Sequence, residues 1–167
     1  FMFEGDNLEY KNLEIGASCG SFGQKYYPRC YLTDAEKNLS KRCTDAHINE
    51  FCKANEIPWE NDRFEVVIMC NPYKYGFDDQ EEANNTLKEM IRVLKKPGQI
   101  LIIGHNKNKY CAAGQVRLRV EKSPYRDRIR FNSSEINPET EYKGYRFQRS
   151  DGTETKPSSR ILLNVTR

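Results

Sequence analysis

Hydrophobic residues along this chain fall into two kinds of pattern. Short apolar runs without polar alternation predict strands that are covered on both faces of a parallel sheet. Phe64–Cys70 is the clearest such run, Gln99–Gly104 is the next predicted buried strand, and Asn12–Ile15 and Cys30–Thr33 are two shorter predicted strands. One long segment, Gln80–Lys96, has apolar residues three and four positions apart and predicts an amphipathic helix that Pro97 ends. Strands that alternate with helices indicate an α/β fold.

Weaker patterns fill the intervals between these elements. Proline and capping residues delimit two short helices, and a mostly polar run indicates a weak third strand. These segments are a helix Ser21–Tyr27 before Pro28, a helix Ala35–Cys43 with Asp34 as N-cap or strand-end carboxylate, and a strand His47–Cys52. Ile57, Pro58 and Trp59 predict a turn, because a residue before proline avoids the helical region.

The last third of the chain changes character. Val116, Leu118 and Val120 alternate with charged residues, which is typical of a half-exposed strand or of a helix edge. Glu141–Arg149 and Ser159–Val165 predict two strands joined by a turn at Asp151 and Gly152. The chain is therefore expected to form a Rossmann-like three-layer α/β sandwich whose mostly parallel sheet ends in an antiparallel hairpin.

Charge divides the chain into two parts. A length of 167 residues indicates one domain, 1–167, and the net charge is +3. Residues 1–106 contain 13 Lys and Arg against 17 Asp and Glu, whereas residues 107–167 contain 14 against 7. Aromatic residues are interleaved with this basic part, which favours binding of nucleic acid through residues 107–167. The alternative is a solvated hairpin surface.

The apolar runs and the cysteine spacing disfavour membrane contact and a metal site. No apolar run approaches the roughly 20 residues that span a bilayer, so no membrane contact is expected. The six cysteines include no Cys-x-x-Cys pair, and the two histidines are not close to a cysteine in sequence. We therefore expect no metal site, and reduced thiols in a cytoplasmic setting.

The opening strand and the next one together predict a nucleotide site. Asn12–Ile15 leads into a turn that contains Gly16 and Gly20, and Cys30–Thr33 leads into Asp34. In a parallel sheet both strands end at one edge, where glycines allow close approach of a ligand and a carboxylate accepts ribose hydroxyls. The glycine spacing lacks the first tight pair of the dinucleotide dehydrogenases, which disfavours that class.

Four motifs in the same order resemble those of class I S-adenosylmethionine-dependent methyltransferases. They are Leu13–Gly20, Asp34, residues 55–68 (NEIPW through FEVVI) and Leu94–Leu101 (LKKPGQIL). The resemblance covers about residues 10–110, so residues 1–110 are expected to form the cofactor-binding core and 111–167 the basic hairpin region on the substrate side. It implies that S-adenosyl-L-methionine binds Glu14, Gly16, Ala17, Ser18, Cys19, Gly20, Asp34, Ala35, Asn55, Glu56 and Ile57.

Individual roles follow from the same resemblance. The turn is expected to wrap the methionine part, Asp34 to hold the ribose, and Asn55 to bond the adenine amino group. Glu14 is expected either to bond the methionine ammonium or to cap the adjoining turn. The span from the turn to Asp34 is about one helical turn shorter than in the family, and no segment within these 167 residues corresponds to the family's usual N-terminal helix.

Candidate catalytic residues follow the two central strands. Asn71, Pro72 and Tyr73 resemble, with one proline fewer, the Asn-Pro-Pro-Tyr signature of enzymes that methylate amino nitrogens. There the Asn oxygen and a proline carbonyl accept hydrogen bonds from the target amine, and the aromatic ring stacks on the base. The alternative is an ordinary Asn-Pro turn. His105 is expected to act as a general base or phosphate contact, or to lie on the rim.

These observations predict N-methylation of a nucleic-acid base, with RNA preferred over DNA. Methylation of a small molecule or a protein is the first alternative, and a non-catalytic binding module is the second. The sequence begins shortly before its first strand, which is also typical of the excised catalytic domain of a larger bacterial toxin. In that case a secreted parent protein delivers the domain to the cytoplasm, and an inhibitor or immunity protein is a further expected partner.

Overall fold

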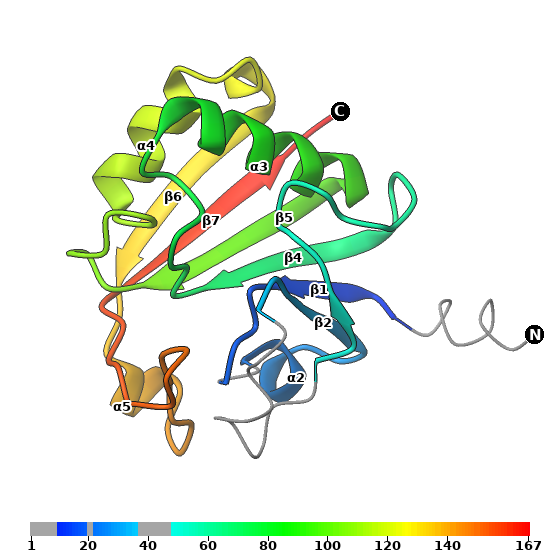
Figure 1. The fold of residues 1–167 in the computed structure, drawn as a ribbon. Coiled ribbons are helices and arrows are strands. Elements are labelled where there is room, and N and C mark those ends of the chain that lie inside the picture. Colours follow the sequence, from blue (N-terminus) through cyan, green and yellow to red (C-terminus); the bar gives the residue numbers. More distant parts are fainter. Residues whose placement is uncertain (1–9, 20–21, 37–47) are drawn as a thin grey trace, which may run out of the picture.

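A seven-stranded mixed sheet organises the molecule (Figure 1). The computed structural model describes residues 10–19, 22–36 and 48–167. The strands are β1 (Asn12–Ile15), β2 (Cys30–Asp34), β3 (Glu50–Phe51), β4 (Phe64–Cys70), β5 (Leu94–Gly104), β6 (Ile129–Glu135) and β7 (Ser159–Val165). Their order is β3-β2-β1-β4-β5-β7-β6. The pairs from β3 to β5 are parallel, and β7 is antiparallel to both of its neighbours. The predicted α/β class and the antiparallel end are confirmed.

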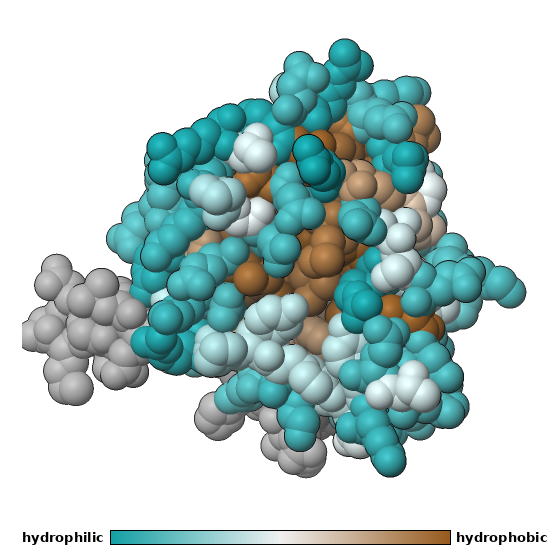
Figure 2. Space-filling model, turned by 180° about the vertical axis from the view of Figure 1, so that it is seen from behind, coloured by the Kyte–Doolittle hydropathy of each residue, from teal (hydrophilic) through white to brown (hydrophobic). Residues whose placement is uncertain are grey.

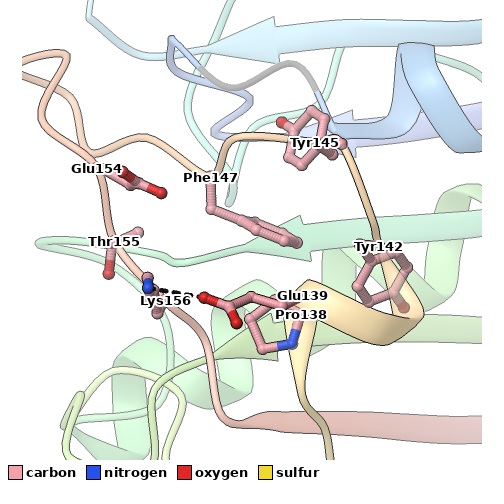
Figure 3. Close-up of a pocket in the computed structure, with 9 residues that line it drawn as sticks. Pro138, Glu139, Tyr142, Tyr145, Phe147, Glu154, Thr155 and Lys156 are labelled. Atoms are coloured by element: carbon pink, nitrogen blue, oxygen red, sulfur yellow. Dashed lines mark hydrogen bonds and ion pairs between the residues drawn. The ribbon is translucent and has the colours of Figure 1, made fainter.

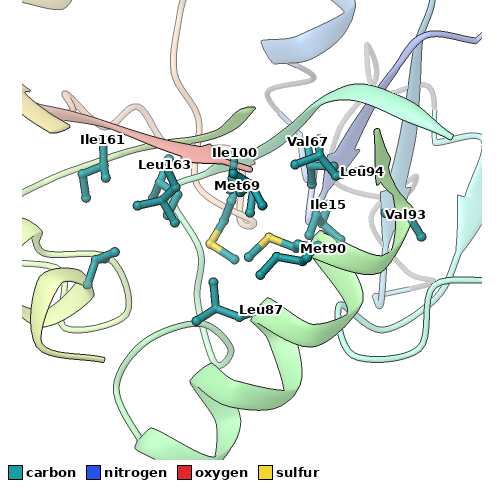
Figure 4. Packing of buried hydrophobic residues seen from close by; sticks show 14 of the residues in the cluster. Ile15, Val67, Met69, Leu87, Met90, Val93, Leu94, Ile100, Ile161 and Leu163 are labelled. Carbon is teal, nitrogen blue, oxygen red and sulfur yellow. The ribbon is translucent and has the colours of Figure 1, made fainter. Parts of the chain in front are cut away.

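Two helices cover one face of this sheet. They are α3 (Gln80–Val93) and α4 (Ala113–Glu121), which lie together in Figure 1. Asp79 caps α3 by accepting a hydrogen bond from the Glu82 backbone N–H at 3.0 Å. Leu87 and Met90 of α3 meet inward-facing side chains of the sheet, among them Met69 (Figure 4). This cluster is the larger of the two apolar cores.

The opposite face carries a second core. It is formed by Leu32, Ile68, Leu101 and Ile103, which alternate with the residues of the first core along their strands. Helix α2 (Phe22–Tyr26) packs on this face, together with a segment between β6 and β7 that we call the 136–158 insert. The view from behind shows apolar surface at the centre of this face, surrounded by polar residues (Figure 2).

The 136–158 insert contains α5 (Pro138–Glu141), whose N-cap is Asn137. Tyr142, Tyr145 and Phe147 of the insert surround Phe22 of α2, with ring centroids 5.2 to 5.7 Å apart. The predicted strand Glu141–Arg149 is therefore wrong. Its aromatic side chains pack on α2, and the outer neighbour of β7 in the sheet is β6.

Helix α3 is shorter than predicted. It ends at Val93, and residues 94–98 begin the long strand β5, in which Leu94 pairs with Phe64 of β4. Pro97 disfavours the helical region for Lys96, which keeps this stretch extended. The predicted helix over Gln80–Lys96 is correct only as far as Val93.

The remaining differences are local. Residues 116–121 belong to helix α4, so of the two predicted alternatives, a half-exposed strand or a helix edge, the helix is correct. Most of the predicted helix Ala35–Cys43 lies outside the described residues. Cys30, Cys52, Cys70 and Cys111 are free, whereas Cys19 is disulfide-bonded. The expectation of reduced thiols is wrong for Cys19, because spacing along the chain does not show which cysteines the fold brings together. Within the described ranges, no helix is long and apolar enough to cross a membrane.

Candidate functional site

The candidate site lies where the parallel strands end. β1 has β2 on one side and β4 on the other. The strand order therefore reverses at β1: β2 and β3 extend the sheet in one direction, and β4 and β5 extend it in the other. Ligands of open α/β sheets bind at such a reversal, outside the carboxyl ends of the strands. β1, β2 and β4 are parallel neighbours, so their carboxyl ends share one edge of the sheet. The site residues predicted after these three strands therefore lie at that edge.

The turn after β1 and the carboxylate after β2 are in direct contact. The Ser18 backbone N–H donates to Asp34 Oδ2 at 2.9 Å, and the Glu36 N–H donates to Asp34 Oδ1 at 2.8 Å. Gly16 and Ser18 have φ values of 61° and 55°, in the left-handed region that favours glycine. Burial raises the pKa of Asp34, and the two backbone donors partly oppose that rise. Gly20, the last glycine of the turn, lies outside the described residues.

Glu14 lies beneath this turn and is fully buried. Its Oε1 accepts a hydrogen bond from the Gly23 N–H, in the first turn of α2, at 2.6 Å. Its Oε2 has no hydrogen-bond partner among the described residues. Burial raises the pKa of Glu14 to about 8. Glu14 therefore caps the first turn of α2, and its second oxygen remains for a cationic ligand, whose charge would favour the ionised carboxylate.

The loop after β3 contains the residues assigned to the adenine side. It begins beside Asp34, because the Cys52 N–H donates to the Asp34 carbonyl at 2.9 Å. The buried Oδ1 of Asn55 has no partner among the described residues. Ile57 differs, because its side chain is buried in the core and its N–H donates to Glu89 at 2.9 Å.

Asn71 and Pro72 present two oxygens to a single amino group. Asn108 Nδ2, in the loop after β5, donates to Asn71 Oδ1 at 3.2 Å and to the Pro72 carbonyl at 3.0 Å. The side-chain amide of Asn108 has the same NH₂ group as an amine substrate. The two oxygens thus converge on one nitrogen, as the Asn-Pro-Pro-Tyr resemblance implies.

Aromatic and basic side chains surround this pair of oxygens. The Tyr73 ring is 64% exposed and lies edge-on to Tyr110, with centroids 5.8 Å apart. Lys74 Nζ lies 5.4 Å from the Tyr73 ring centroid, and Lys109 Nζ lies 5.2 Å from that of Tyr110. The loops after β4 and β5 therefore form a surface that combines the exposed Tyr73 and the half-buried Tyr110 with positive charge.

His105 begins the loop after β5. Its Nδ1 accepts a hydrogen bond from the Lys107 N–H at 3.1 Å. In neutral imidazole the other nitrogen, Nε2, then has the proton and is a donor. This geometry favours the phosphate-contact role over the general-base role, and both stay predictions.

Tyr75 is a site residue that sequence reasoning missed. Its hydroxyl donates to the Ile15 carbonyl at 3.2 Å, and its ring lies so close to Gly16 that a Cβ there would collide with the hydroxyl. Burial raises the pKa of Tyr75 well above its usual range, and Asp34 and Glu14 add to the effect. Tyr75 thus joins the loop after β4 to the glycine turn. Its place two residues after Tyr73 was the only signal in the sequence.

The 136–158 insert reaches the same edge. The Ser158 N–H donates to the Gly104 carbonyl at 3.0 Å, where β5 ends. Burial raises the pKa of Tyr145, and Cys70 and Glu14 raise it further. The insert also has a pocket of about 160 Å³, toward which the rings of Tyr142 and Phe147 point (Figure 3).

Comparison with known proteins identifies the fold. No protein-family model and no curated protein sequence matches the chain. Solved structures do match it. A possible histamine N-methyltransferase from Thermotoga maritima has 11% identity, with 94% of this chain and 82% of that chain covered and a TM-score of 0.57. N-methyltransferase NodS from Bradyrhizobium japonicum has 14% identity, with 95% and 86% covered and a TM-score of 0.59.

A third match has the cofactor bound. Phosphoethanolamine N-methyltransferase 2 from Haemonchus contortus, in complex with S-adenosyl-L-methionine, has 13% identity and a TM-score of 0.55, with 94% of this chain and 48% of that chain covered. Identities this low establish the fold alone. The chain therefore has the fold of the class I S-adenosylmethionine-dependent methyltransferases.

Proposed function

We propose that this protein is an S-adenosylmethionine-dependent methyltransferase that methylates an amino nitrogen of a nucleic-acid base. The observation that carries the proposal is the convergence of Asn71 Oδ1 and the Pro72 carbonyl on one NH₂ group, within 3.2 Å of its nitrogen. Two fixed acceptors orient an amine, so that its lone pair is directed toward an electrophile.

The cofactor half of the site fits S-adenosylmethionine. Glu14 Oε2, Ser18 Oγ and Asn55 Oδ1 are buried and have no partner among the described residues. Buried polar atoms in native proteins are nearly always paired, so a ligand that supplies partners explains them. A methionine ammonium suits Glu14, and an adenine amino group suits Asn55. Asp34, which has lone pairs left on both oxygens, would hold the ribose.

When bound, the cofactor supplies an electrophilic methyl group: an N–C bond forms as the S–C bond breaks, the electron pair stays on sulfur, and the nitrogen then loses a proton. The residues of this chain bind and orient the reactants. Asn71 and Pro72 would hold the amine, and Tyr75 would fix the glycine turn relative to them.

Nucleic acid is favoured as the substrate by the surface around Asn71. Tyr73 offers an exposed ring for stacking on a base, and Lys74 and Lys109 lie beside the rings of Tyr73 and Tyr110. Residues 107–167 have an excess of seven positive charges over negative ones. RNA is preferred over DNA, because single-stranded bases are already accessible for stacking.

The test is incubation of RNA, DNA, protein and metabolite pools with methyl-labelled S-adenosylmethionine. We expect label in RNA, and we expect Asn71→Ala to abolish labelling while calorimetry shows unchanged cofactor affinity. Asn164→Ala is the matched control, because Asn164 lies in β7 and bonds Gln99 on an exposed part of the sheet. Label confined to protein or metabolites would contradict the nucleic-acid assignment. No binding of the cofactor would favour the non-catalytic module.

A small-molecule substrate is the second candidate, and the pocket of the 136–158 insert favours it. Three aromatic side chains line this pocket, together with Glu139, Glu154 and Lys156. Glu139 and Lys156 form an ion pair at 2.9 Å (Figure 3). Label in the metabolite pool, lost on Phe147→Ala, would support this candidate. The inhibitor partner and the parent toxin stay predictions.

A further inference from the structure

We propose that Asn108 is a positioning residue, which fixes Asn71 and Pro72 so that the site accepts a primary NH₂ group and methylates it once. This inference rests on the proposed function and adds a residue, a requirement on the substrate and a limit on the product. Asn108 lies 37 residues beyond Asn71 in the chain and belongs to none of the four motifs.

The side chain of Asn108 is held in one orientation. Its Oδ1 accepts a hydrogen bond from the Tyr110 N–H at 2.9 Å, so its Nδ2 must be the end that faces Asn71 and Pro72. Its backbone is also fixed, since its N–H donates to the His105 carbonyl at 2.9 Å and its carbonyl accepts from Ala112 at 2.8 Å. A side chain with both ends bonded has little freedom to leave.

The loop that contains Asn71 depends on this contact. Asn71 has a φ of 50°, and its N–H donates to the Ile103 carbonyl at 2.6 Å, so its backbone is anchored to β5. The loop after β5 packs closely on β5 itself, because a Cβ on Gly104 would collide with Cys111 Sγ. Among the described residues, the side-chain oxygen of Asn71 is oriented by one hydrogen bond, the one from Asn108.

A count of lone pairs sets the requirement on the substrate. Each carbonyl oxygen has two acceptor sites, and Asn108 occupies one on Asn71 Oδ1 and one on the Pro72 carbonyl. One site on each oxygen remains. A primary amine can satisfy both sites with two hydrogens on one atom, whereas a hydroxyl has one hydrogen and can satisfy only one. An acceptor that bound substrate shields from water and leaves unpaired disfavours the group with fewer donors.

The same count limits the product. Methyl transfer forms one N–C bond, and the nitrogen loses one proton, so the product amine keeps one N–H. It can pair with only one of the two free acceptor sites, while its new methyl group has to occupy the space of the lost hydrogen. The monomethylated base is therefore bound less well for a second transfer than the unmodified base is for the first.

The test uses Asn108→Asp, which keeps the acceptor for Tyr110 and replaces the donor with a second acceptor. We expect kcat to fall at least tenfold with S-adenosylmethionine affinity within twofold of the wild type. Asn85→Asp is the matched control, because it adds the same charge at an exposed position of α3, outside the loops after β4 and β5; it should keep the wild-type kcat. Asn108→Ser, which restores a small donor, should recover part of the loss in kcat.

Four homopolymers serve as substrates: poly(A), poly(C) and poly(G), whose bases have an exocyclic NH₂ group, and poly(U), whose base has none. We expect label in one of the first three, none in poly(U), and a single methyl per base by mass spectrometry. Wild-type kinetics in Asn108→Asp, or dimethylated product from the wild type, would overturn the inference while leaving the proposed function intact. Label in poly(U), or no transfer to any polymer, would overturn both.

Discussion

The backbone N–H of Ser18 donates to the carboxylate of Asp34 across 2.9 Å. This contact joins the ends of two parallel strands and places the turn and the carboxylate on one side of the sheet. A ligand that bridges the turn and the carboxylate needs both at this edge, so the contact is the structural basis for the proposed cofactor site.

Replacement of Asp34 tests that site directly. Asp34→Ala is expected to weaken S-adenosylmethionine binding by about 1–3 kcal/mol, because two ribose hydroxyls lose their acceptor. Isothermal titration calorimetry measures the change. Asp127→Ala is the control, since the side chain of Asp127 is 93% exposed, and its affinity should match the wild type. Equal affinity in both variants would place the ribose elsewhere.

Glu14 is expected to make stability depend on pH. Its pKa is raised from 4.5 to about 8 in the folded state. Between these values the folded protein holds a proton that the unfolded chain has lost. The free energy of unfolding therefore falls as pH rises through this window, by on the order of 1.4 kcal/mol per pH unit.

Urea unfolding from about pH 5 to about pH 8 measures this dependence. Glu14→Gln does not titrate but keeps an acceptor for Gly23, so its stability should change less with pH across the same range. The same slope in both proteins would show that Glu14 is not the group responsible.

Two helical glycines give opposite predictions. A Cβ on Gly23 of α2 would lie 3.0 Å from Glu14 Oε1 and would collide with Cys30, so Gly23→Ala should destabilise the protein by about 1–3 kcal/mol. A Cβ on Gly114 of α4 meets nothing within 4 Å, so Gly114→Ala should stabilise it by about 0.5–1 kcal/mol. Thermal unfolding compares them. Equal and small effects would contradict the close packing at Gly23.

Arg92 is expected to hold the loop of the adenine side in place. Its guanidinium donates to the carbonyls of Ile57 and Trp59, each at 2.7 Å, and pairs with Glu89 at 2.7 Å. Arg92→Ala should cost about 1.5–3 kcal/mol of stability and raise amide exchange near Ile57. Arg126→Ala, at a side chain 68% exposed, should cost almost nothing. Unchanged exchange near Ile57 would mean that this loop is held by other contacts.

The sequence was sufficient for the parallel half of the fold. A strand covered on both faces is mostly apolar, so Phe64–Cys70 was recognisable from its apolar run. The same reasoning gave the edge at which Asp34 and Asn71 lie, because parallel strands end together.

The antiparallel end was harder to predict, for a physical reason. β6 is an edge strand, and Asn132, Ser133 and Ser134 are exposed, so it lacks the apolar signal of a covered strand. The aromatic stretch from Tyr142 to Phe147 had that signal but serves to cover α2. Apolar composition predicts that a segment is buried, but it does not predict which element the segment packs against.

Contacts between loops were beyond prediction from the sequence. Tyr75 bonds Ile15 across 60 residues, and Asn108 bonds Pro72 across 36. Neither partner is signalled by periodicity or by a motif, because loop geometry sets these contacts. These loop contacts form because the ends of β1, β4 and β5 lie side by side in the sheet.

The two ends of the 136–158 insert meet each other, since the Ile136 N–H donates to the Ser158 carbonyl at 3.0 Å. A segment closed at its own base can lengthen, shorten or be exchanged without moving the strands that flank it. Evolution or protein engineers can therefore vary this one appendage, and with it the surface beside the candidate site, while the parallel strands and the turns at their carboxyl ends keep their positions.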